Sequence, residues 1–228
     1  MVNGPSGLVT CLVMFSALRT MSRVVIGRAL IVQCLLLMPF VAQAAERTIL
    51  VFGDSISAGY GLKAEESWVS LLQKRLVSQG YGYRVVNASV SGETTSGGIA
   101  RLPRALDLHS PQIVVIELGA NDGLRGLPLD LSRRSLAGMI EAAQARGSAV
   151  LLLGMRVPPN YGARYAESFH QMYAELARQY DVALVPFFME KVALEPGLMQ
   201  ADGLHPTAAA QTLLLDTAWP ALRRLITG

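Results

Sequence analysis

Short apolar runs alternate along the chain with longer segments in which apolar residues recur every three or four positions. The runs occupy residues 48–52, 84–88, 113–118, 148–153 and 182–185. Runs of this length with few polar interruptions are typical of strands that are buried on both faces of a parallel sheet. The pattern therefore predicts five buried strands.

The segments between the runs have the spacing of amphipathic helices. Ser67 is a candidate N-cap for the first helix, and Gly80 is a candidate stop. We expect residues 155–162 to form a loop, because paired prolines interrupt both helices and strands. Residues 186–203 have no regular period. The predicted helices are residues 67–80, 94–106, 131–146 and 165–180, with a terminal helix that begins near Pro206.

Five alternations of strand and helix predict the α/β class, because parallel strands are joined by helices that cover both faces of their sheet. The expected architecture is a three-layer α/β/α sandwich with a five-stranded parallel sheet in the flavodoxin-like order 2-1-3-4-5. No internal repeat or linker interrupts residues 45–228. These residues are therefore predicted to form a single domain.

Residues 1–44 have the pattern of a secretory signal peptide. Arg23 and Arg28 precede an apolar run at 29–41, and Ala42-Gln43-Ala44 matches a small-x-small cleavage site. The run is too short and too interrupted to be a membrane span. We expect cleavage after Ala44, no stable membrane anchor afterwards, and a periplasmic or secreted product. Translation that starts at Met21 would give a signal of ordinary length.

Charge and cysteine content limit the remaining function classes. The chain has 20 basic and 17 acidic residues, and the excess lies in three arginines of the first 44 residues. The rest is electrically balanced, which argues against nucleic acid as a partner. Cys11 and Cys34 both lie in the predicted signal peptide. The exported chain therefore has no disulfide and no thiolate metal site.

Four polar clusters interrupt the otherwise apolar pattern. The first three follow predicted strands, so they share the carboxyl edge of the sheet, where open α/β sheets bind ligands. The fourth precedes the terminal helix, which can bring it back to the same edge. The clusters are Gly53-Asp54-Ser55, Ser91-Gly92, Gly119-Ala120-Asn121-Asp122 and Asp202-Gly203-Leu204-His205.

A hydrolytic serine needs an imidazole base, a carboxylate that orients it and donors for an oxyanion. Of the three histidines, we interpret His109 as a loop residue and His170 as an ordinary helix residue. His205 lies three positions after Asp202 in a turn. A purely structural turn explains Asp202 and His205 equally well. Asn121 can offer an amide donor or simply form a turn. We expect Asp54 and Asp122 to position their own loops.

Together the four clusters resemble the motifs of the GDSL or SGNH hydrolase family, in order and in spacing, over residues 47–225. The chain looks most similar to a bacterial periplasmic branch that acts as thioesterase, arylesterase and lysophospholipase. Ile56 replaces the leucine of the four-letter name, and Glu93 stands where the shorter Asp is expected. These two departures leave the catalytic set intact.

The resemblance implies roles for individual residues. Ser55 would be the nucleophile, His205 the general base and then acid, and Asp202 the group that orients His205. The oxyanion hole would consist of the backbone N–H groups of Ser55 and Gly92 and the side chain of Asn121. No cofactor and no metal are implied. The predicted enzyme is a serine esterase or thioesterase, and we expect it to be a monomer.

The substrate expected from the sequence is a small-molecule ester or thioester with an apolar acyl or aryl group. The apolar loop residues predicted to contact it are Leu124, Leu127, Pro159 and Tyr161, with Pro128, Met199 and Leu204 nearby.

Three alternatives stay open. A carbohydrate O-acetyl esterase of the same fold would need only a small acyl pocket. A metal-dependent phosphoesterase would use Asp54, Asn121, Asp122 and His205. Metal sites of this kind usually contain several histidine ligands, and this set has one. A binding module of flavodoxin type would have no catalytic serine.

Overall fold

The structure is a computed structural model that describes residues 47–228. The predicted signal peptide, its cleavage site at Ala44 and the alternative start at Met21 lie outside the described residues.

The described chain forms one parallel sheet in the order β2-β1-β3-β4-β5, which confirms the predicted order. Val51 of β1 lies opposite Asn87 of β2, and Gly53 lies opposite Glu117 of β3. The first and third strands are thus neighbours at the centre of the sheet. The strands are β1 (Arg47–Gly53), β2 (Tyr83–Asn87), β3 (Ile113–Glu117), β4 (Ala149–Leu153) and β5 (Ala183–Val185).

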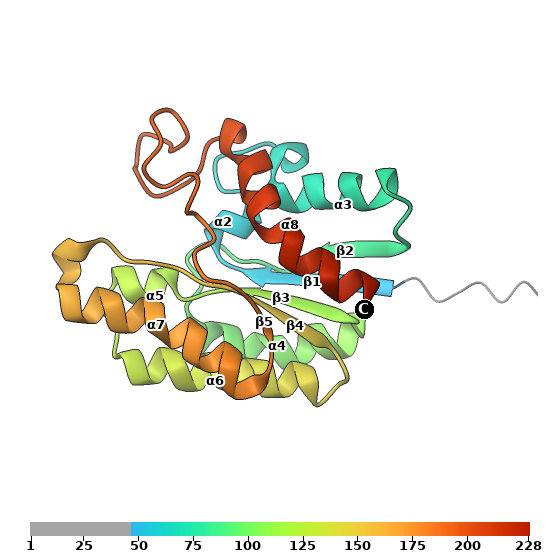
Figure 1. Cartoon of the computed structure of the whole chain (residues 1–228), viewed down its shortest axis with the longest axis horizontal. Coiled ribbons are helices and arrows are strands. Elements are labelled where there is room, and N and C mark those ends of the chain that lie inside the picture. Colours follow the sequence, from blue (N-terminus) through green and yellow to red (C-terminus); the bar gives the residue numbers. More distant parts are fainter. Residues whose placement is uncertain (1–46) are drawn as a thin grey trace, which may run out of the picture. The chain divides into compact units, whose positions relative to one another are not determined.

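Helices cover both faces of the sheet, which confirms the predicted three-layer sandwich (Figure 1). The α-helices are α2 (Ser55–Ala58), α3 (Trp68–Ser78), α4 (Thr95–His109), α5 (Ala120–Leu124), α6 (Leu129–Gln144), α7 (Ala163–Tyr180) and α8 (Gln211–Thr227). Short 3-10 helices are η1 (Ala64–Glu66), η2 (Pro159–Tyr161) and η3 (Ala208–Ala210). Figure 1 shows α3 and α8 over one face, and α4, α6 and α7 over the other.

The central strands are apolar on both sides because both of their faces are covered. Successive side chains of a strand point to opposite faces, so a strand between two helical layers needs apolar residues at every position. Ile49, Leu50, Val51 and Phe52 of β1 are all completely buried, and every residue of β3 is buried. The strands are therefore a rigid support for the loops at their carboxyl ends.

The helix starts follow local hydrogen bonding where the sequence supplies a cap. The Ser67 side chain accepts a bond from the Ser70 N–H, as expected of the N-cap of α3. Thr94 caps α4 in the same way through the Gly97 N–H. None of the helices in residues 47–228 is long and apolar enough to cross a membrane.

The predicted start of the terminal helix near Pro206 is wrong, because α8 begins at Gln211. Met199 and Pro206 instead form an antiparallel bridge. The Thr207 N–H donates to the Leu198 carbonyl at 2.8 Å, and the Gln200 N–H donates to the His205 carbonyl at 2.7 Å. The His205 carbonyl, which would accept the first bond of a helix begun at Pro206, is taken by Gln200, and the helix begins only after η3.

Candidate active site

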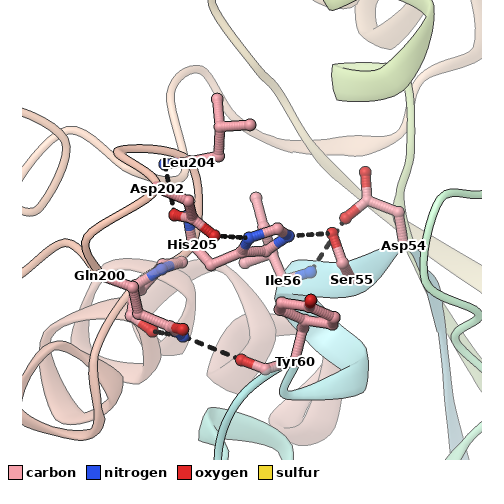
Figure 2. A network of polar contacts seen from close by, with 9 residues as sticks. Asp54, Ser55, Ile56, Tyr60, Gln200, Asp202, Leu204 and His205 are labelled. Carbon is pink, nitrogen blue, oxygen red and sulfur yellow. Dashed lines mark hydrogen bonds and ion pairs between the residues drawn. The ribbon is translucent and has the colours of Figure 1, made fainter.

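Ser55, His205 and Asp202 form a continuous hydrogen-bonded series (Figure 2). Ser55 Oγ lies 2.9 Å from Nε2 of His205. Nδ1 of His205 lies 2.7 Å from Oδ2 of Asp202. The structure thus brings together a hydroxyl, an imidazole and a carboxylate from opposite ends of the described chain, in the order that nucleophilic catalysis requires.

The turn between β1 and α2 holds Ser55 at the carboxyl edge of the sheet. Asp54 is the N-cap of α2, and its Oδ1 accepts a bond from the Ile56 N–H at 3.0 Å. Gly53 is required just before this turn, since a Cβ there would lie 2.6 Å from Oε2 of Glu117. Ser55 is the first residue of the helix that follows. The prediction that Asp54 positions its own loop is confirmed.

The turn from Asp202 to His205 is organised by the Asp202 carboxylate. Oδ1 of Asp202 accepts bonds from the backbone N–H groups of Leu204, at 2.9 Å, and His205, at 3.0 Å. Oδ2 is left to receive the imidazole. The hydrogen bond from His205, with smaller contributions from the two backbone donors, lowers the pKa of Asp202 to about 2. Asp202 is therefore ionised over the whole range in which a neutral imidazole can act as a base.

Two residues that sequence reasoning missed hold the His205 turn against the segment that follows α2. The ring of Tyr60 lies against the ring of His205, with centroids 4.4 Å apart. Nε2 of Gln200 donates to the carbonyl oxygens of Tyr60, at 2.9 Å, and Pro206, at 3.0 Å (Figure 2). Neither residue belongs to a polar cluster that follows a strand. Their role depends on contacts between distant segments, for which the sequence carries no local signal.

Asn121 lies beside the nucleophile turn, at the start of the short helix α5. Its Nδ2 donates to Oδ2 of Asp54 at 3.2 Å. An amide nitrogen carries two protons, so a second donor remains for another acceptor. Burial raises the pKa of Asp54 to about 6, although the bonds from Ile56 and Asn121 and the nearby His205 oppose this. Asn121 and Asp54 lie close together because they follow β3 and β1, which are adjacent at the point where the strand order reverses.

Gly92 lies in the loop after β2, with a φ of 79° that favours glycine. Its carbonyl accepts a bond from Nη2 of Arg125 at 3.1 Å, a contact that sequence reasoning missed. The neighbouring Glu93 side chain pairs with Arg101, Nε to Oε2, at 2.6 Å. The longer acidic side chain at this position thus serves to hold α4.

The sequence led us to expect that Asp122 positions its own loop. Its buried side chain instead bonds to residues of two helices. It accepts bonds from the N–H and hydroxyl groups of Thr95 and from the hydroxyl of Ser132, at 3.1 Å. Thr95 belongs to α4 and Ser132 to α6. The carboxylate of Asp122 therefore joins the Asn121 segment to two helices.

A pocket of about 580 Å³ is lined mainly by apolar side chains, among them Ile56 and Leu204, which are the chain neighbours of Ser55 and His205. Leu124, Met199 and Leu204 are lining residues, as expected, whereas Leu127 and Tyr161 are not among them. The side chain of Pro159 lies outside the described part of the structure. Lining residues missed from the sequence belong to α2, α5, the loop after β4, α7 and the segment after β5: Ile56, Ala120, Met155, Val157, Ala166, Phe187 and Met189.

The other two histidines are not part of the Ser55 series. His170 lines the pocket, and its Nε2 lies 2.8 Å from Nη2 of Arg156. Burial and the Arg156 charge lower the pKa of His170. Within residues 47–228, no group of three or more histidine, cysteine, aspartate or glutamate side chains is arranged to hold a metal ion.

A flavodoxin-like sheet with a serine, histidine and aspartate series at its carboxyl edge defines the class of enzymes that hydrolyse ester bonds through a serine. The chain belongs to the GDSL-like lipase/acylhydrolase family, whose model matches residues 51–213. This match confirms the resemblance found in the sequence motifs.

Two known relatives and one solved structure illustrate the similarity. The chain is 54% identical to esterase TesA of Pseudomonas aeruginosa over 200 residues, which cover 87% of this chain and 100% of the relative. It is 44% identical to thioesterase 1/protease 1/lysophospholipase L1 of Escherichia coli over 192 residues, covering 84% of this chain and 90% of the relative. A crystal structure of TesA has a TM-score of 0.77 and 55% identity, and covers 78% of this chain and 99% of that one.

Proposed function

We propose that the protein hydrolyses carboxylic esters and acyl thioesters through an acyl-enzyme formed on Ser55. The observation that carries the proposal is the series from Ser55 Oγ through His205 to Asp202, with distances of 2.9 and 2.7 Å. Both are hydrogen-bond distances, so proton transfer from the hydroxyl to the imidazole needs no rearrangement.

In the first step, Ser55 Oγ attacks the carbonyl carbon of the substrate and passes its proton to Nε2 of His205. Asp202 accepts the Nδ1–H and stabilises the imidazolium ion that forms. When the tetrahedral intermediate collapses, the bond to the alcohol or thiol breaks. The imidazolium returns its proton to this leaving group, and the acyl group stays on Ser55.

The negative oxygen of the intermediate needs donors that are already in place. We assign this role to the backbone N–H groups of Ser55 and Gly92 and to the second Nδ2–H of Asn121. The hydrogen bond from Asn121 to Asp54 supports the assignment, because it orients the amide beside the nucleophile turn. The positive φ of Gly92 likewise sets the direction of its peptide groups.

Water completes the cycle. His205 takes a proton from a water molecule, whose oxygen attacks the acyl carbon, and the second intermediate collapses to release the carboxylic acid. Ser55 Oγ receives the proton back from the imidazolium. The reaction balances as ester plus water to acid plus alcohol, or thioester plus water to acid plus thiol.

The apolar pocket of about 580 Å³ supports an acyl or aryl group larger than acetyl as the bound part of the substrate. The name of the E. coli relative includes thioesterase and lysophospholipase, and both activities break acyl bonds of this kind. We propose that the enzyme acts as an exported, periplasmic monomer on small-molecule substrates. The signal-like pattern of residues 1–44 supports export.

Labelling with a fluorophosphonate tests the proposal, because this reagent forms a stable phosphonyl ester with an activated serine. Peptide mass analysis should place the added mass on Ser55. Ser55→Ala should neither take up the label nor hydrolyse nitrophenyl esters, while it should unfold at the same temperature as the wild-type protein.

The same assay separates the alternatives. Full activity in EDTA is expected, whereas loss of activity in EDTA would favour a metal-dependent phosphoesterase. Hydrolysis of acetate esters alone would favour a carbohydrate O-acetyl esterase. A protein whose Ser55 resists the reagent would instead be a binding module.

A further inference from the structure

Glu117 is an acidic residue in the apolar centre of the sheet, directly below the nucleophile turn. It ends β3, lies opposite Gly53 of β1 and is completely buried. Nothing in the proposed reaction uses its carboxyl group. A buried carboxyl group is costly in a core, so its presence needs a structural or functional reason.

One oxygen of Glu117 collects hydrogen bonds from both sides of Ser55. Oε2 accepts from the hydroxyl of Ser57 at 2.7 Å and from the Ser57 N–H at 3.2 Å. It also accepts a longer bond from the Asp54 N–H at 3.4 Å. These donors belong to the residues that precede and follow the Ser55–Ile56 pair, so the carboxyl group spans the turn that carries the nucleophile.

Trp68 extends the network to the helix that covers this face. Its Nε1–H donates to the Ser57 hydroxyl oxygen at 3.2 Å, and Trp68 is completely buried. The Ser57 hydroxyl has one proton, which is then directed to Glu117. The nucleophile turn is thus tied to β3 and α3 through side chains that do not contact the substrate pocket.

The surroundings of Glu117 favour its neutral form. Burial raises the pKa of Glu117 well above its usual range, and the charge of Asp54 raises it further. Among the described residues its second oxygen, Oε1, has no hydrogen-bond partner. A neutral carboxyl group keeps a carbonyl oxygen, so Oε2 of Glu117 can still accept hydrogen bonds from Ser57 and Asp54.

We propose that Glu117 is a positioning residue for the hydrolysis, and that it holds the backbone of residues 54–57 so that Ser55 keeps its alignment with His205 and with the oxyanion donors. The proposal rests on the function proposed for Ser55. What it adds is that a hydrogen-bond acceptor at position 117 is needed for turnover. Glu117 acts through the turn, and it contacts neither the substrate nor the proton that is transferred.

Glu117→Gln and Glu117→Leu separate the two properties of the side chain. Glutamine keeps an acceptor oxygen of the same shape without the ability to ionise, so it should retain most of the wild-type kcat. Leucine keeps the volume but removes the acceptor, so kcat should fall about a hundredfold, as small displacements of a reacting group do. The rate of Ser55 phosphonylation should fall in parallel, with KM little changed.

Val115→Ala is the matched control, because Val115 is a buried residue of β3 two positions earlier, on the same face, and it contacts no group of the turn by a hydrogen bond. It should lower the unfolding temperature while it leaves kcat and the phosphonylation rate unchanged. Ser57→Ala provides a second test if Glu117→Leu fails to fold. It removes one donor to Glu117 and should lower kcat without raising KM.

The outcomes distinguish this inference from the proposed function. A wild-type protein that neither labels at Ser55 nor hydrolyses esters would overturn the proposed function itself. An active wild type with full kcat in Glu117→Leu and Ser57→Ala would overturn only the role of Glu117. A glutamine variant as inactive as the leucine variant would show that an acceptor oxygen at position 117 is not sufficient, and would overturn the inference.

Discussion

The amide nitrogen of Asn121 has two N–H donors. One Nδ2–H donates to Asp54, and the proposed function assigns the other to the oxyanion. Asn121→Ala should lower kcat by about 10²–10³, the usual effect of removing one oxyanion donor, and should leave KM nearly unchanged. Steady-state kinetics with a nitrophenyl ester measures both constants.

Asn121→Asp controls for the lost volume, because it keeps the shape of the side chain and removes its N–H donors. It should be at least as slow as the alanine variant. An aspartate variant with wild-type kcat would contradict the assignment of Asn121 to the oxyanion.

Asp54 makes stability depend on pH in a direction opposite to that of a salt-bridged acid. Its pKa is raised from 3.8 to about 6 by burial, so between these values the folded protein binds a proton that the unfolded chain lacks. Its contribution to the free energy of unfolding therefore falls as pH rises through this window. Asp54→Asn lacks this titration.

Urea unfolding of both proteins at about pH 4.5 and about pH 7.5 tests the sign. The free energy of unfolding of the wild type, relative to that of Asp54→Asn, should be greater at the lower pH. An equal difference in the free energy of unfolding at both pH values would contradict the raised pKa of Asp54.

At the scale of elements, the loop after β3 is fixed by the helices that it contacts. Asp122 accepts bonds from Thr95 of α4 and Ser132 of α6, and all three side chains are buried. Asp122→Ala leaves these donors without partners. It should lower the free energy of unfolding by about 2–5 kcal/mol in urea denaturation, since each unpaired buried group costs about 1–3 kcal/mol.

Asp130→Ala is the comparison for this variant, because Asp130 is an exposed acid in the first turn of α6. Its effect should stay within about 1 kcal/mol. Equal losses in both variants would contradict a special role for Asp122.

The helix ends show where local sequence sufficed and where it did not. Ser67 caps α3 through its own neighbour Ser70, so a pattern of a few residues predicts that start. The start of α8 depends on bonds between residues 198–200 and residues 205–207, which compete with helix formation. Proline at position 206 is compatible with either arrangement, and only the tertiary contacts decide between them.

At the scale of the whole molecule, the pocket is lined by α2, α5, the loop after β4, α7 and the segment after β5, and we propose that it receives the acyl group. Each methylene buried there contributes about 0.8 kcal/mol, or about fourfold in kcat/KM. We therefore expect kcat/KM for nitrophenyl esters to rise from acetate towards octanoate. Acetate preferred over longer chains would contradict this use of the pocket.

Ala166→Trp tests whether the acyl chain of the substrate lies against α7, because Ala166 of this helix lines the pocket. The larger ring should lower kcat/KM for octanoate and leave acetate almost unchanged. Arg178→Trp adds the same ring at an exposed position further along α7 and should alter neither substrate. A loss shared equally by both esters would instead indicate damage to the Ser55 series.

The two helical layers and the shared edge of Ser55 and Asn121 follow from the sequence alone, because apolar period predicts buried strands and parallel strands present their carboxyl ends at one edge. The pairing of His205 with Ser55 was implied by the resemblance of the four motifs, since His205 follows no strand. Only the tertiary structure decided the parts that distant segments build together. Tyr60 against His205, the lining of the pocket and Glu117 beneath the nucleophile turn depend on side-chain contacts across the fold. A single acidic residue at the end of an apolar strand has no local pattern that reveals what it will face.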